Sequence, residues 1–288
     1  MTNFPLTLAF AALSLTFAGC TGKDTDTGAG DTDADTDTDT DTDTDTDTDT
    51  DTDTDTDLPT VTYSVTGTAV DFATRGPATE GLCVVGVNPG PALTGGDPIV
   101  LATSTVGAGG AYTLADLTVK PTVGLVVIIR DCGAEGTVYS TGTGISFATL
   151  DPIPDGGTLA DRVSFSLMAE MRDGLVDSLG AAGNTWDPAT QGILMGFVLD
   201  STTGTPIGGA TVTAGGTSTF YMDTDPSDGL FTNSTTGVNA ATDPAAGVFA
   251  IPDAAITTYT CAADGYTFDT LTGGSLAGMA LFVAFYSL

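Results

Sequence analysis

Residues 196–212 read Gly196-Phe-Val-Leu-Asp200, then Ser-Thr-Thr-Gly-Thr-Pro-Ile-Gly, then Gly209-Ala-Thr-Val212. Apolar residues stand on both sides of a short segment that is rich in glycine, threonine and proline. Gly204 can adopt a positive φ and Pro206 fixes its own φ, so we expect a tight turn between two β-strands. Asp200 precedes this bend directly, and we expect its side chain to cap the turn.

The same pattern occurs earlier in the chain. Gly67-Thr-Ala-Val-Asp71 leads into a turn through Gly76-Pro77, and the strand-like segment Gly81-Leu-Cys-Val-Val85 follows. Further on, each copy has a turn glycine before an alternating segment with an inward aromatic residue, at Gly110-Ala-Tyr112 and at Gly247-Val-Phe249. Short strands at a spacing of about ten residues, separated by Gly, Pro and Asp, are typical of a small β-sandwich. The sequence therefore predicts a mainly β protein with two sandwiches.

The second copy resembles a known family. Residues 196–266 contain G-x-V-x-D-x-x-T-G-x-P-I-x-G-A-x-V, then G-x-F, and finally Y-x-x-x-x-x-G-Y. This pattern resembles the carboxypeptidase regulatory-like domain, which is a transthyretin-like (Ig-like) sandwich. The first copy resembles it more loosely, because Thr74-Arg-Gly-Pro77 replaces the T-G-x-P turn. The resemblance implies a binding or spacing module and supplies no catalytic motif.

The N-terminal segment has the features of a lipoprotein signal. An apolar run from Phe4 to Gly19 is long enough for a signal peptide and shorter than the roughly 20 residues of a spanning helix. Phe17-Ala-Gly-Cys20 resembles a lipobox, so we predict a signal peptide over 1–19 and lipidation of Cys20. Two or three acyl chains would anchor the protein stably in a membrane. Thr21 favours the outer membrane, and we predict that the protein lies on the cell surface, with the periplasmic face as the alternative. An ordinary signal peptide before an incidental cysteine also stays open.

Residues 20–57 form an acidic, low-complexity tract. Asp31 to Asp57 alternates Asp with Thr, broken once by Ala34, and the tract carries about half of the formal charge of −31. Both faces of such a segment are polar, so it cannot be buried as a strand. Repulsion between aspartates extends the chain, and we predict a disordered tether. Lipobox, tether and sandwiches together resemble predicted surface lipoproteins of myxobacteria.

The remaining chain divides into 58–150 as sandwich 1, 151–192 as a helical connector and 193–288 as sandwich 2. The connector is predicted from an amphipathic helix over Leu159–Leu179, with Gly180 past its end. Its apolar residues recur every three or four positions, at Val163, Leu167, Met168, Met171, Leu175 and Leu179.

Three cysteines follow Cys20. We predict a disulfide between Cys83 and Cys132, because both fall in the first sandwich, and a buried free thiol at Cys261.

One segment of the second copy resembles a calcium loop. Asp223, Asp225 and Asp228 supply carboxylates, but Gly229 is one place late for an EF-hand and position twelve is Ser234. A looser Ca²⁺ site that uses these three aspartates is therefore an alternative, and we predict no other cofactor.

The chain lacks the residues of common catalytic sites. It contains no histidine, and only six Lys and Arg against 37 Asp and Glu, which argues against triads, zinc sites and nucleic-acid binding. We therefore predict a surface-tethered envelope lipoprotein that is not an enzyme, with a structural or recognition role. Its partners would be the membrane through the lipid anchor, and an envelope protein or glycan. The alternatives are a Ca²⁺-assisted adhesin-like binder and a carboxylate-based hydrolase.

Overall fold

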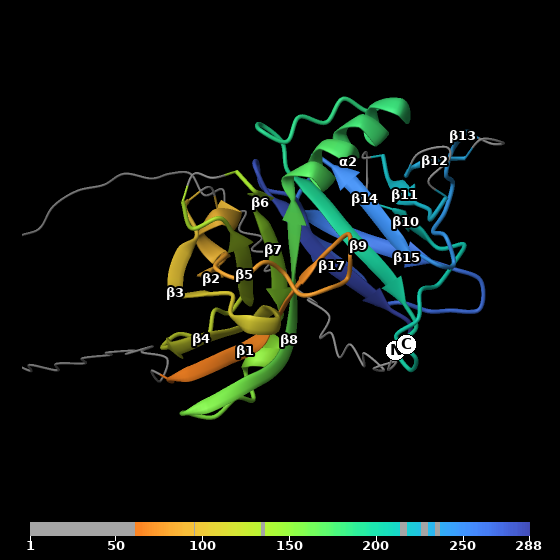
Figure 1. The fold of residues 1–288 in the computed structure, drawn as a ribbon. Helices are drawn as coiled ribbons and strands as arrows, with labels where there is room; N and C mark the ends of the chain where they lie inside the picture. Colours follow the sequence, from red (N-terminus) through yellow and green to blue (C-terminus); the bar gives the residue numbers. More distant parts are fainter. Residues whose placement is uncertain (1–60, 95, 134–135, 214–217, 226–229, 234–236) are drawn as a thin grey trace, which may run out of the picture. The chain divides into compact units, whose positions relative to one another are not determined.

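The computed structural model describes residues 61–288 except 95, 134–135, 214–217, 226–229 and 234–236 (Figure 1). Strands provide most of the regular structure in this part of the chain. The predicted signal peptide, Cys20 and the tether lie outside these residues. The strands of the first half are β1 (Tyr63–Asp71), β2 (Cys83–Asn88), β3 (Ile99–Thr105), β4 (Ala111–Leu117), β5 (Leu125–Arg130), β6 (Val138–Tyr139), β7 (Thr141–Ile145) and β8 (Gly157–Met168). Those of the second half are β9 (Ile193–Leu199), β10 (Thr211–Thr213), β11 (Phe220–Met222), β12 (Thr232–Asn233), β13 (Gly237–Val238), β14 (Val248–Pro252), β15 (Thr257–Ala262), β16 (Leu271–Gly273) and β17 (Ala280–Tyr286).

The two halves repeat one strand topology. In the first, β1 lies between the antiparallel strand β4 and the parallel strand β8, while β2, β5 and β7 pair in that order in the opposing sheet. In the second, β9 lies between the antiparallel strand β14 and the parallel strand β17, and β10, β15 and β16 form the opposing sheet. The protein is therefore mainly β and sandwich-like, as the sequence predicts.

Backbone pairing joins the two sandwiches. Strand β17 of the second half pairs in parallel with β7 of the first, through Ala280↔Thr141, Leu281↔Gly142 and Phe282↔Thr143. A single eight-stranded sheet results, with the order β11-β14-β9-β17-β7-β5-β2-β3.

Burial explains the composition of the strands. β4 alternates between exposed and buried residues from Ala111 to Ala115, whereas every residue of β9 is buried because both of its faces are covered. Three apolar clusters account for this burial. One fills the first sandwich around Leu114, Leu125 and Ile129, and a second fills the other sandwich around Phe249 and Tyr259. The third lies between the halves and combines Phe72 and Phe165 with Phe197 and Phe282.

The repeated glycines and aromatic residues of the sequence turn out to be cross-strand partners. Gly67 lies opposite Tyr112 between β1 and β4, and Gly196 lies opposite Phe249 between β9 and β14. A Cβ atom at either glycine would collide with the ring of its partner. The absence of a side chain at each glycine thus makes room for a buried aromatic ring.

The predicted helix over Leu159–Leu179 is wrong in its first half. Residues 157–168 form strand β8, and helix α2 spans Ala169–Ala181. Asp161 has a φ of 59° at a bulge in the pairing of β1 with β8, which breaks the two-residue period of the strand and imitates a helical spacing. Four successive residues of β8, from Ser164 to Leu167, are buried, so burial on both faces also hid the alternation.

Helix α2 ends later than predicted. Gly180 lies within the helix, and Gly183 has a φ of 87° just beyond it, while the amide of Asn184 donates to the carbonyl oxygen of Leu179. A left-handed glycine in this position is a common helix ending. The other helical segments are short: α1 (Phe147–Leu150), η1 (Gly90–Thr94) and η2 (Ala108–Gly110).

The strand β8 belongs to the first sandwich by pairing, although it falls in the range assigned to a helical connector. The connector is thereby corrected to α2 and the segment that leads to β9. The other domain boundaries remain predictions.

Candidate functional site

The two repeated turns place their aspartates in equivalent positions. Oδ1 of Asp71 accepts hydrogen bonds from the backbone amide (2.7 Å) and the hydroxyl (2.8 Å) of Thr74. Oδ1 of Asp200 likewise accepts from the amide (2.8 Å) and the hydroxyl (3.0 Å) of Thr203. Both carboxylates therefore cap the bend that follows them.

The environments of these two aspartates differ. Asp200 lies at the surface, and hydrogen bonds from the backbone and side chain of Thr203 lower its pKa below the usual value. Asp71 is only 8% exposed, and its Oδ2 atom is buried without a hydrogen-bond partner. Ser166, its neighbour across the β1–β8 pairing, also has a buried hydroxyl without a partner. A polar pair is thus buried next to the first turn.

The first turn differs from the second at the residue that takes a positive φ. Arg75 has a φ of 60° where the second turn has Gly204 with a φ of 68°. The amides of both residues donate to the carbonyl oxygen of the capping aspartate, at 2.9 and 2.8 Å. The bends are therefore the same, but only the first carries a long cationic side chain.

The guanidinium of Arg75 lies over aromatic rings from both sandwiches. It is 4.7 Å from the ring centroid of Phe72 and 4.9 Å from that of Phe197. Desolvation of the guanidinium by the rings beneath it lowers the pKa of Arg75, although the residue is exposed on its outer side, and the charge of Asp71 opposes that shift. Sequence reasoning treated these positions as turn residues and missed the contact, because it joins segments that are far apart in the chain.

The calcium candidate is only partly described. Asp223 and Asp225 follow β11, and Oδ1 of Asp223 accepts the amide of Asp225 at 3.1 Å. Oδ2 of Asp223 accepts the side-chain amide of Asn239 at 2.9 Å. Asp228 lies outside the described residues. Within the described ranges, no group of three or more His, Cys, Asp or Glu residues is arranged to hold a metal ion.

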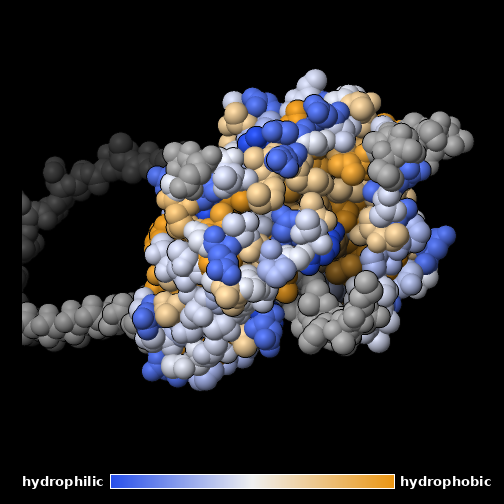
Figure 2. All heavy atoms as spheres, in the orientation of Figure 1, coloured by the Kyte–Doolittle hydropathy of each residue, from blue (hydrophilic) through white to orange (hydrophobic). Residues whose placement is uncertain are grey.

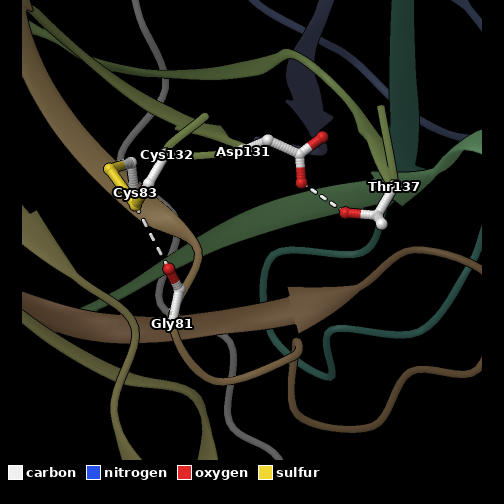
Figure 3. Close-up of a disulfide and its surroundings, with 5 residues drawn as sticks. All are labelled: Gly81, Cys83, Asp131, Cys132 and Thr137. Carbon is white, nitrogen blue, oxygen red and sulfur yellow. Dashed lines mark hydrogen bonds between the residues drawn. A yellow bond between two sulfur atoms is a disulfide. The ribbon is translucent and has the colours of Figure 1, made fainter. Parts of the chain in front are cut away.

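A disulfide joins Cys83 at the start of β2 to Cys132 after β5 (Figure 3). Its Cα atoms are 4.9 Å apart, and Cys132 Sγ lies 3.2 Å from the carbonyl oxygen of Gly81. Beside it, the carboxylate of Asp131 accepts hydrogen bonds from the Thr137 hydroxyl and the Val138 amide (3.1 Å). These bonds lower the pKa of Asp131 although burial acts in the opposite direction. The disulfide thus links the neighbouring strands β2 and β5, and Asp131 fixes the start of the segment that leads from β5 to β6.

Cys261 is a free thiol on β15. It is partly buried, and burial raises its pKa to about 12. A thiol of this kind is protonated near neutral pH and therefore a weak nucleophile.

No family model and no curated protein matches this chain. Solved structures with some similarity include the Bacillus anthracis TIE protein, at 12% identity and a TM-score of 0.24, where the match covers 79% of this chain and 34% of that one. Shaft pilin SpaA from Lactobacillus rhamnosus GG gives 12% identity and a TM-score of 0.23, covering 80% of this chain and 98% of the pilin. The match to GBS52, a minor pilin of Streptococcus agalactiae, has a TM-score of 0.22 and covers 95% of that pilin. Similarities this low carry no argument about function.

Among the described residues, no helix has both the length and the apolar character needed to cross a membrane.

Proposed function

We propose that this chain is an envelope lipoprotein in which Cys20 carries the lipid, residues 20–57 form the tether, and the two sandwiches have a non-enzymatic structural or recognition role at the outer membrane. The anchor and the tether are proposed from the sequence alone. The structure describes the two sandwiches, which are the part of the chain that the tether would hold away from the membrane.

The hydrogen bonds that aspartate side chains make within their own turns best support a structural role. Asp71, Asp187, Asp200 and Asp243 each accept hydrogen bonds from backbone amides of their own turns. Such contacts fix the conformation of the turns. A carboxylate-based hydrolase would instead need two acids about 5–10 Å apart across a cleft. The carboxylates named here shape loops, which suits a rigid module for spacing or recognition.

The protein is also built to keep its two sandwiches together. The β7–β17 pairing and the third apolar cluster both join residues of the two halves. A disulfide adds a covalent bond in the first sandwich. Stability of this kind is useful to a protein that works outside the cytoplasm, and the partner we propose is an envelope protein or glycan.

The anchor can be tested with the full chain expressed in a Gram-negative host. We expect globomycin, which blocks lipoprotein signal peptidase, to cause an unprocessed precursor to accumulate, and labelled palmitate to enter the wild-type chain. Cys20→Ser should abolish the labelling, while Cys261→Ser, a matched control, should leave it unchanged. Normal processing in globomycin, or an unmodified Cys20 thiol in the mass spectrum of the mature protein, would refute the proposal.

The location can be tested in the same cells. Protease added to intact cells should degrade the protein if it lies on the cell surface. Degradation only after the outer membrane is permeabilised would place it on the periplasmic face.

A further inference from the structure

The turn after β1 crosses from the first sandwich to the second. In Figure 1 the orange segment that follows β1 lies over β9 and β17. The ring contacts agree: the centroid of Phe72 is 6.0 Å from that of Phe197 on β9 and 5.2 Å from that of Phe282 on β17. Figure 2 shows hydrophilic atoms in the middle of this face with apolar surface beside them. The turn therefore covers apolar residues at the seam between the sandwiches.

The backbone conformation at Arg75 costs more free energy than it would with glycine at the same position. Arg75 has a φ of 60°, whereas the equivalent turn of the second sandwich has glycine at the same position. Glycine adopts a positive φ freely, but a residue with a side chain does so only at a cost in free energy. Because Gly204 shows that glycine is sufficient for this bend, turn formation alone does not account for arginine.

The contacts of the Arg75 side chain explain why arginine stands at this position instead of glycine. Phe165 on β8 belongs to the first sandwich and Phe197 on β9 to the second, and the Arg75 guanidinium lies 5.9 and 4.9 Å from their ring centroids. A guanidinium at this distance is attracted to the negative face of a ring. Arg75 therefore contacts both sandwiches at once, from the exposed side of the seam.

We propose that residues 71–77 are a strap across the seam and that Arg75 is its latch. With the latch closed, the cation–π contacts hold the first sandwich against the second and cover Phe197. The positive φ of Arg75 offsets part of this attraction, so the net contribution of the latch is smaller than that of the cation–π contacts alone. Opening of the latch leaves the apolar cluster and the β7–β17 pairing in place but loosens the seam beside that pairing. This inference does not depend on lipidation or on the proposed role.

The test is hydrogen exchange of the full chain, measured by mass spectrometry over strands β7 and β17, which pair with each other through residues 141–143 and 280–282. Arg75→Gly removes the latch and also relieves the backbone strain. We expect it to increase exchange over these strands about threefold, in line with the loss of an exposed cation–π contact. Arg75→Gln retains the strain and removes only the charge, and it should have a similar effect. Arg75→Lys keeps a cation and should restore part of the protection.

The matched control is Gly204→Arg. It places arginine in the equivalent turn, where it introduces the same strain, and it should leave exchange over β7 and β17 unchanged. Wild-type exchange over these strands in both Arg75→Gly and Arg75→Gln would overturn the proposal. An equal increase in Gly204→Arg would also overturn it, because the seam would then respond to turn strain in general. If one Arg75 variant fails to fold, the other two still decide the question.

Discussion

Removal of the Cys83–Cys132 disulfide gives the most quantitative test of the stability of the first sandwich. The bond closes a loop with a sequence separation of 49 residues. In the loop-entropy description, cross-linking a loop of this length reduces the entropy of the unfolded chain by about 14 cal/mol/K, or about 4 kcal/mol at 25 °C. The folded state should lose little, because Cys83 lies opposite Arg130 in the β2–β5 pairing, which holds the two segments together without the bond.

The perturbation is the Cys83→Ala/Cys132→Ala double variant. Both it and its reference protein should carry Cys261→Ala, so that no free thiol can exchange with the disulfide. A loss of about 4 kcal/mol corresponds to a decrease of roughly 8–16 °C in the melting temperature of a domain of this size. Circular dichroism measured during heating, without reductant, reports this temperature.

Urea unfolding distinguishes the origin of the effect. If the bond acts on the unfolded chain, its removal lets that chain expand, and the slope of the unfolding free energy against urea should increase. A decrease of less than about 3 °C in the melting temperature would refute the loop-entropy reasoning for this protein. A large decrease with an unchanged urea slope would show instead that the bond stabilises the folded sandwich directly.

Three further predictions concern single sites. Gly196→Ala should destabilise the protein by about 1–3 kcal/mol in urea unfolding, because the added methyl group overlaps the Phe249 ring; a neutral effect would contradict that packing. Burial raises the pKa of Cys261 to about 12, so its contribution to stability should be complete below about pH 9 and decline up to about pH 12. Cys261→Ala should remove this component of the alkaline loss, and an unchanged profile would contradict it. For the calcium alternative, binding at Asp223 with extracellular-type affinity would raise the melting temperature by about 1–5 °C in 1 mM Ca²⁺. Asp223→Asn should abolish that rise, and no rise in the wild-type protein would contradict the site.

The sequence predicted the sandwich-like fold because its turns are encoded locally. The bend at Asp200 needs only a carboxylate, a threonine and a left-handed glycine within a few positions, and all of these are visible in the chain. At Asp71 the carboxylate and the threonine are equally visible, but the left-handed residue is Arg75, which the sequence does not mark. The alternation of β4 is likewise visible in the chain. A prediction that rests on neighbouring residues in this way does not depend on the rest of the molecule.

The features that failed depend on partners elsewhere in the chain. Strand β8 was mistaken for a helix because its bulge at Asp161 is defined only by the pairing with β1. The β7–β17 junction and the Arg75 contact with Phe197 were missed for the same reason. Each joins segments separated by more than one hundred residues, and no local pattern marks them.

The shared sheet has a consequence for biosynthesis. Strand β7 is translated long before β17, so the nascent first sandwich has an unpaired edge strand until most of the second sandwich has been made. Bare edges of this kind recruit strands from other molecules. A chain that crosses a membrane unfolded and folds only after its export would avoid the exposure, and we expect premature folding during translation to favour aggregation. For the exported protein that we propose, the continuity of the sheet thus makes the delay of folding until after export a condition for avoiding aggregation.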